Sequence, residues 1–219
     1  MKILLACEES QSVCKAFRDL GHEAFSCDTQ ECSGGHPEWH IKDDVLKVIN
    51  AGWDMMIAFP PCTYLTCRAQ SHNIRLNRVQ EKKDAIEFFM KMINAPIERI
   101  AVENPKGIMN SGFRKPDQII QPFYFGEPHR KMICLWLKNL PKLKWTKADN
   151  LFEKQTAVQE EIKYYRKDGK PIHWVDAFTP SDERQKLRSK TFQSIANAMG
   201  EQWGSISVSS LSFCGEEKK

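Results

Sequence analysis

The sequence predicts a doubly wound α/β fold, with a mostly parallel sheet, helices on both faces and a small polar insertion. Two observations predict it. Short apolar runs that fit buried strands alternate with segments whose apolar residues recur at helical spacing. Polar side chains follow directly after several of these runs, where parallel strands would end. The 219 residues suffice for one hydrophobic core, so we expect one domain over 1–204 and a flexible Ser-rich tail over 205–219.

The expected elements follow one another as strand and helix. Strands are predicted over residues 2–6, 24–27, 54–59, 100–102 and 133–137. Helices are predicted over 11–20, 81–93 and 189–203, where apolar residues share one face. Between the last strand and the last helix, residues 141–187 are polar, contain three prolines and show no clear period. We therefore expect an insertion or extended loop there.

Composition narrows the class of protein. Hydrophobic residues make up 41% and charged residues 27%, a balance typical of soluble globular chains. No apolar run approaches the roughly 20 residues that span a bilayer, and the first apolar residues are too few for a signal peptide, so we expect a cytoplasmic protein. The eight cysteines are dispersed along the chain, which favours reduced thiols over disulfide bonds. A net charge of +4 permits a polyanionic partner without requiring one.

Two segments carry reactive groups at predicted strand ends. Cys62 follows a buried strand and a rigid Pro60-Pro61 turn. Glu103 ends another strand, where an unpaired carboxylate would be costly to bury without a partner or a task. Because carboxyl ends of parallel strands meet at one edge of a sheet, we expect a thiol and a carboxyl group at a common edge.

The order of these segments resembles the cytosine-C5 DNA methyltransferases, most closely their compact, phage-type members. The resemblance covers roughly residues 3–138 and 188–203. The matching segments are Leu5 to Phe17 (cofactor loop), Asp28, Asp44-Val45, Phe59 to Thr66 (Pro-Cys loop), Glu103-Asn104-Pro105, Phe125 to Lys131 and Ser194 to Gly200 (closing helix).

The resemblance implies a Rossmann-like methyltransferase fold that uses S-adenosylmethionine and needs no metal. It implies that Cys62 adds to C6 of cytosine, so that C5 becomes nucleophilic. Glu103, protonated, would neutralise charge at N3, and Arg130 or Lys131 would hold the base carbonyl. The cofactor would be bound by Cys7, Glu8, Glu9, Ser10, Asp28, Asp44, Pro60 and Asn197.

The first loop departs from the family pattern. Where the family has glycines, this chain has Cys7-Glu8-Glu9-Ser10. Two interpretations stay open. Glu8 or Glu9 binds the amine of the cofactor's methionine moiety, or both cap the helix over 11–20 at its positive end.

The family's target-recognition domain is also nearly absent. Residues 141–187 interleave aromatic and basic side chains that could stack on bases or could cover the edge of the core: Trp145, Tyr164, Tyr165, Arg166, Lys167 and Trp174. The basic segment 68–78 after the nucleophile fits a mobile loop over phosphate or a plain solvated loop.

Three alternatives accompany the expected methylation of cytosine in DNA. Cys27, Cys32, His36 and His40 have the residue types of a zinc site, although without the usual spacing. The reduced insertion is compatible with methylation of a free pyrimidine nucleotide, and RNA is a further possible partner. The altered first loop is compatible with a non-catalytic module that binds nucleic acid or protein.

Overall fold

The computed structural model describes residues 1–145, 157–173 and 190–206. Most of the expected tail, 207–219, lies outside these ranges, as do Trp174 and a large part of the expected insertion. None of the helices in the described ranges combines the length and apolar character needed to cross a membrane.

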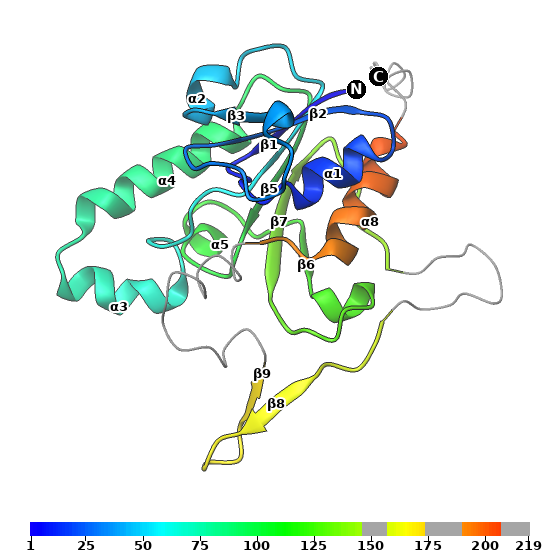
Figure 1. Ribbon diagram of the computed structural model, residues 1–219. Coiled ribbons are helices and arrows are strands. Elements are labelled where there is room, and N and C mark those ends of the chain that lie inside the picture. Colours follow the sequence, from blue (N-terminus) through cyan, green and yellow to red (C-terminus); the bar gives the residue numbers. More distant parts are fainter. Residues whose placement is uncertain (146–156, 174–189, 207–219) are drawn as a thin grey trace, which may run out of the picture.

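A seven-stranded sheet in the order β3-β2-β1-β4-β5-β7-β6 forms the centre of the structure (Figure 1). The five strands from β3 to β5 are parallel, and β7 runs antiparallel to both β5 and β6. The direction of winding reverses between β1 and β4, as in Rossmann-like sheets. The strands are β1 (Lys2–Ala6), β2 (Glu23–Asp28), β3 (His40–Lys42), β4 (Met55–Ala58), β5 (Arg99–Asn104), β6 (Gln118–Ile120) and β7 (Ile133–Lys138).

Helices cover both faces of this sheet, which confirms the predicted fold class. Alternate residues of each strand point to opposite faces, so Ile3 and Leu5 pack in one core cluster while Leu4 and Ala6 pack in the other. Helices α1 (Ser12–Arg18) and α8 (Gln193–Gly204) cover the first face. Helices α2 (Val45–Val48), α4 (Val79–Ile93) and α5 (Met109–Gly112) cover the second.

The segment after Cys62 corrects one expectation. Residues expected as a loop over 68–78 form helix α3 (Cys67–Arg75), and Asn77, with a φ of 49°, separates it from α4. No glycine or proline lies between residues 67 and 75, so neither of the two strongest helix-breaking residue types interrupts α3. The segment lacks a broad apolar face, and that is why its periodicity did not predict a helix.

The expected insertion also contains regular structure. Strands β8 (Ile162–Tyr165) and β9 (Pro171–His173) form an antiparallel hairpin that is separate from the main sheet. Its signal in the sequence is the Asp168-Gly169 pair between two short β-prone runs, a combination typical of a hairpin turn. Two short 3₁₀ helices, η1 (Pro37–Trp39) and η2 (Pro122–Phe125), are too short for the spacing of apolar residues to predict them.

Candidate active site

The Cys62 loop lies at the carboxyl edge of the sheet, as predicted. The backbone N–H of Phe59 donates to the carbonyl of Ala6 (2.9 Å), which continues the strand pairing to the start of the loop. The carbonyl oxygen of Cys62 then accepts from the N–H groups of Leu65 (3.0 Å) and Thr66 (3.2 Å), forming a tight turn. Cys62 itself is half-buried. Its position is therefore set by backbone hydrogen bonds on both sides.

The end of β5 and the loop that follows it are hydrogen-bonded to the Cys62 loop. The side-chain amide of Asn104 donates to the carbonyl oxygen of Pro60 (2.9 Å). The N–H of Ile108 donates to the carbonyl of Leu65 (2.8 Å). A Cβ added at Gly107 would lie 2.0 Å from that same Leu65 oxygen, so only glycine permits this approach. The Cys62 loop is therefore held against both the end of β5, which bears Glu103, and the loop that follows β5.

Glu103 and Lys131 come together at this edge. Because β7 is antiparallel to β5, the residues just before β7 lie beside the end of β5, where Glu103 pairs with Leu135. Burial raises the pKa of Glu103, and the positive charge of Lys131 opposes that rise. The neighbouring Arg130 instead contacts Glu160, with 3.5 Å between Nη1 and Oε1. Of the two predicted cations, Lys131 is the one that lies near the carboxyl group.

Four buried oxygen atoms at this end of the sheet have no hydrogen-bond partner among the described residues. They are Glu103 Oε1, Asn104 Oδ1, Gln121 Oε1 and Ser194 Oγ. Gln121 follows the end of β6, and the N–H of Ser194 at the start of α8 donates to Glu127 Oε1 (2.7 Å). Buried polar atoms without partners are uncommon and often indicate a site for a ligand or water. Gln121 was missed in the sequence because no chemical motif contains it.

The predicted cofactor residues Cys7, Asp28 and Asp44 lie near one another. Cys7 has a φ of 60°, in the region that favours glycine, and its N–H donates to the carbonyl of Cys27 (2.7 Å). Burial raises the pKa of the Cys7 thiol, and the charges of Asp28 and Asp44 raise it further. Asp28 Oδ1 accepts from the N–H of Gln30 (2.9 Å), and Asp44 Oδ1 caps α2 through the N–H of Leu46 (3.0 Å). The result is an acidic group beyond the ends of β1, β2 and β3.

Glu8 caps helix α1, as one of the two interpretations expected. Its two carboxylate oxygens accept from the N–H groups of Val13 (2.6 Å) and Cys14 (3.1 Å). Burial raises the pKa of Glu8 to about 7, although both hydrogen bonds favour the charged form. Glu9 does not cap the helix, because its carboxylate accepts a hydrogen bond from the hydroxyl of Ser33. Ser10 contacts Ser12 through their hydroxyl oxygens (3.3 Å).

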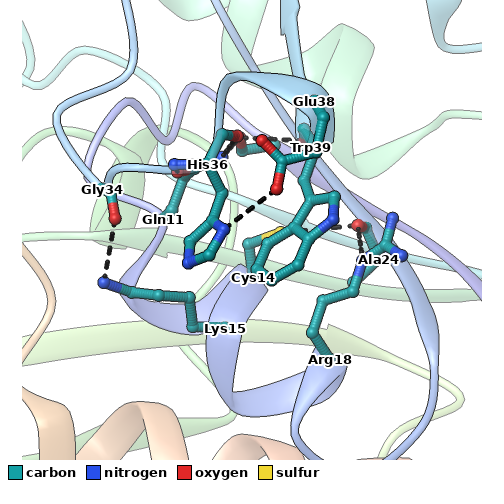
Figure 2. A network of polar contacts seen from close by, with 10 residues as sticks. Gln11, Cys14, Lys15, Arg18, Ala24, Gly34, His36, Glu38 and Trp39 are labelled. Atoms are coloured by element: carbon teal, nitrogen blue, oxygen red, sulfur yellow. Dashed lines mark hydrogen bonds and ion pairs between the residues drawn. The ribbon is translucent and has the colours of Figure 1, made fainter.

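Gln11, which was not predicted as a site residue, connects the first loop to the loop before β3. It is fully buried, and its side-chain amide bonds to Ser26 Oγ (3.2 Å), the carbonyl of His36 (2.7 Å) and the N–H of His36 (3.1 Å). Figure 2 shows the surrounding contacts, in which the Lys15 ammonium group donates to the carbonyl of Gly34 (3.3 Å). The His36 and Trp39 rings stack at 3.8 Å. These contacts fix the loop against α1.

The remaining predicted residues have local partners. Asn197 lies on the exposed side of α8, where its amide oxygen accepts from Gln193 Nε2 (2.8 Å). The Pro60 carbonyl is bound by Asn104. Trp145 stacks on Tyr124 (4.9 Å), which favours its alternative role at the edge of the core.

The four residues considered for zinc do not converge on one point. His40 contacts Ser26 Oγ (2.8 Å) and the carbonyl of Gln30 (2.9 Å) with its two ring nitrogens. His36 pairs with Glu38 (3.0 Å), and the Cys27 thiol donates to the carbonyl of Asp43 (3.4 Å). The described ranges contain no group of three or more His, Cys, Asp or Glu side chains placed to hold a metal ion.

Comparisons with known proteins add little to this site. No protein-family model matches the chain, and no curated protein matches it. Twenty-six chains of solved structures match. One is described provisionally as a DNA modification methyltransferase encoded within a prophage of E. coli. It is 15% identical, with a TM-score of 0.43, over 62% of this chain and 45% of that chain, so this chain matches less than half the length of that protein. The functional assignment therefore depends on the residues of the chain itself.

Proposed function

We propose that the protein transfers a methyl group from S-adenosylmethionine to C5 of cytosine in DNA, with Cys62 as the nucleophile. One observation carries the proposal: the hydrogen bond from Asn104 to Pro60 binds the Cys62 loop to the end of the strand that bears Glu103. A thiol and a carboxyl group with a raised pKa are thus held at adjacent strand ends, with Lys131 nearby. A reaction that attacks a pyrimidine and protonates it needs these groups.

The acidic group formed by Cys7, Asp28 and Asp44 fits the cofactor. Its carboxylates suit ribose hydroxyls and the positive charges of S-adenosylmethionine. In dinucleotide-binding folds the N-terminus of the first helix binds a phosphate. Here the Glu8 carboxylate occupies that position. A pyrophosphate would meet a protein carboxyl group there, whereas a sulfonium or an amine is compatible with it.

The residues at the carboxyl edge have distinct roles in the proposed reaction. The Cys62 thiolate forms a bond to C6 of the base. Glu103 donates its proton toward N3 and so neutralises the charge that develops in the ring. Lys131 holds the base carbonyl. S-adenosylmethionine supplies the methyl group as an electrophilic carbon on a sulfonium. Loss of the C5 proton to water then breaks the bond from sulfur to C6 and returns Cys62 as a thiolate, and N3 gives its proton back to Glu103.

The test is transfer of label from methyl-labelled S-adenosylmethionine to duplex DNA and, separately, to deoxycytidine monophosphate. We expect label in DNA with the wild-type protein and none with Cys62→Ala. Cys67→Ala is the matched control, because Cys67 is an exposed thiol five positions along the chain and should not affect transfer. Equal labelling by the wild type and Cys62→Ala would remove Cys62 from the reaction. Labelling of the mononucleotide alone would support the proposed reaction at Cys62 but would show that the substrate is a free nucleotide and not DNA.

A further inference from the structure

The β8–β9 hairpin presents aromatic side chains to solvent. Figure 1 shows the hairpin, in yellow, projecting away from the seven-stranded sheet. Among the described strands, β8 and β9 pair only with each other. Tyr164 is 52% exposed and Tyr165 is 63% exposed. A two-stranded hairpin is marginally stable by itself in water, so large exposed rings on such an element suggest a surface that is covered by a partner.

The hairpin is also strongly basic. Between residues 163 and 170 it carries four cationic side chains and one carboxylate, Asp168, which contacts Lys170 (3.5 Å). The turn is closed by hydrogen bonds from the Arg166 N–H to the Lys170 carbonyl and from the Gly169 N–H to the Arg166 carbonyl, both 2.9 Å. Gly169 has a φ of 77°, which this turn requires. Arg166 and Lys167 are therefore displayed at the end of the hairpin.

The base of the hairpin is attached beside the candidate active site. The N–H of Glu161 donates to the carbonyl of Pro128 (2.7 Å), and Arg130 contacts Glu160 (3.5 Å). Three residues earlier in the chain, the N–H of Val158 donates to the carbonyl of Phe123 (2.9 Å). The segment that receives these bonds also carries Lys131, whose charge acts on Glu103. A macromolecule bound to the hairpin would therefore lie next to the proposed reaction site.

We infer that this hairpin binds the major groove of duplex DNA and so replaces a separate recognition domain. Its cationic side chains complement phosphates, and the tyrosine rings provide apolar surface for sugars and thymine methyl groups. The major groove of B-form DNA is about 12 Å wide and admits a two-stranded ribbon, whereas that of A-form RNA is too narrow for side chains to enter. The inference rests on the proposed function in taking DNA as the substrate.

The test measures binding of the full chain to a fluorescent DNA duplex by anisotropy, over a series of salt concentrations. The variant Arg166→Gln/Lys167→Gln removes two charges from the turn. Each lost phosphate contact lowers the slope of log affinity against log salt by about 0.9, so binding should weaken on the order of tenfold to a hundredfold at 0.1 M salt. The matched control is Lys91→Gln/Lys142→Gln, which removes two exposed charges near the opposite edge of the sheet.

A second variant tests the contribution of a tyrosine ring independently of the cationic side chains. Tyr165→Ala removes an exposed, uncharged aromatic side chain. We expect its affinity for the duplex to fall by roughly tenfold, because the buried apolar contact of the ring is lost, while the salt slope stays that of the wild type. An RNA duplex of the same sequence should bind at least tenfold more weakly than the DNA duplex to the wild-type protein.

The outcomes distinguish this inference from the proposed function. If the hairpin variant binds DNA with wild-type affinity and slope, or if the RNA duplex binds equally well, the inference is wrong, whatever the result of the labelling experiment. If the wild type labels only mononucleotides and binds no duplex, the inference is also wrong. If the hairpin variants lose DNA binding while no pyrimidine is labelled, the inference stands and the proposed function fails.

Discussion

The side-chain amide of Asn104 donates a 2.9 Å hydrogen bond to the carbonyl oxygen of Pro60, across two neighbouring strand ends. Asn104 is buried, and Pro60 lies two residues before Cys62. This bond connects the residue next to Glu103 with the turn that bears the thiol. The account of the active site depends on that connection, and the predictions below begin with it.

Replacing Asn104 by Asp keeps the shape of the side chain but removes the donor. A carboxylate facing the Pro60 carbonyl would repel it, so the Cys62 loop should shift. Losing a buried hydrogen bond costs about 1–3 kcal/mol, and a displacement of about 1 Å can reduce turnover on the order of a hundredfold. Kinetics of methyl transfer check this, with thermal unfolding alongside. Asn139→Asp is the control, because Asn139 donates to the Glu98 carbonyl (2.9 Å) away from the site. Equal losses in both variants would contradict the prediction.

Gly107→Ala should disturb a second contact of the Cys62 loop, the one between Leu65 and the loop after β5. A Cβ at this position would lie 2.0 Å from the Leu65 carbonyl oxygen, so the backbone must move. We expect loss of most of the turnover and a lower melting temperature. Gly112→Ala is the matched control, since a Cβ there meets no atom within 4 Å. Wild-type turnover in Gly107→Ala would show that the contact between the loops does not position Cys62.

The pH dependence of turnover should report Glu103. Burial raises the pKa of this carboxyl group, and the proposed reaction uses its protonated form. Turnover at saturating substrate should therefore fall as the pH rises through that elevated pKa. Lys131 lowers the pKa, so Lys131→Met should raise it and move the falling limb to higher pH.

Arg130→Met provides the control for that profile, because Arg130 contacts Glu160 and is not among the causes of the Glu103 shift. Its falling limb should stay at the wild-type pH. If the falling limb moved in Arg130→Met but not in Lys131→Met, then Arg130 and not Lys131 would be the cation that acts on Glu103.

Glu8 should make the stability of the protein depend on pH. Its pKa is raised from 4.5 to about 7 in the folded state. Between these values the folded protein holds a proton that the unfolded chain has lost, so the free energy of unfolding should fall as the pH rises across this window. The total change is about 3 kcal/mol. Urea unfolding at several pH values measures it, and Glu8→Gln should remove this component. An unchanged slope in Glu8→Gln would contradict the prediction.

The general position of the site could be predicted from the sequence because it follows from topology. Cys62 and Glu103 each follow a buried apolar run, and the ends of parallel strands share an edge. The choice between Arg130 and Lys131 could not be made in this way. The antiparallel direction of β7 brings both residues to the end of β5, and the choice depends on their contacts there: Arg130 contacts Glu160, whereas Lys131 acts on Glu103. An apolar run of five or six residues indicates a strand but not its direction.

Other features depend on contacts between distant residues. Gln11 binds three groups of the chain between residues 26 and 36, and nothing in its neighbouring sequence indicates this. Glu8 had two expected roles, and only the position of its carboxylate at the start of α1 distinguishes them. Helix α3 was missed because its residues lack the broad apolar face by which an amphipathic helix is recognised.

The most direct test of the account is covalent trapping of the enzyme on DNA that contains 5-fluorocytosine. Fluorine at C5 cannot leave as a proton does, so the bond between the enzyme and C6 should persist after methyl transfer. The account predicts a protein–DNA adduct that needs S-adenosylmethionine and maps to Cys62 by mass spectrometry of the digested complex. An adduct at another residue, or labelling of ordinary cytosine by a protein that forms no adduct with the fluorinated DNA, would contradict it.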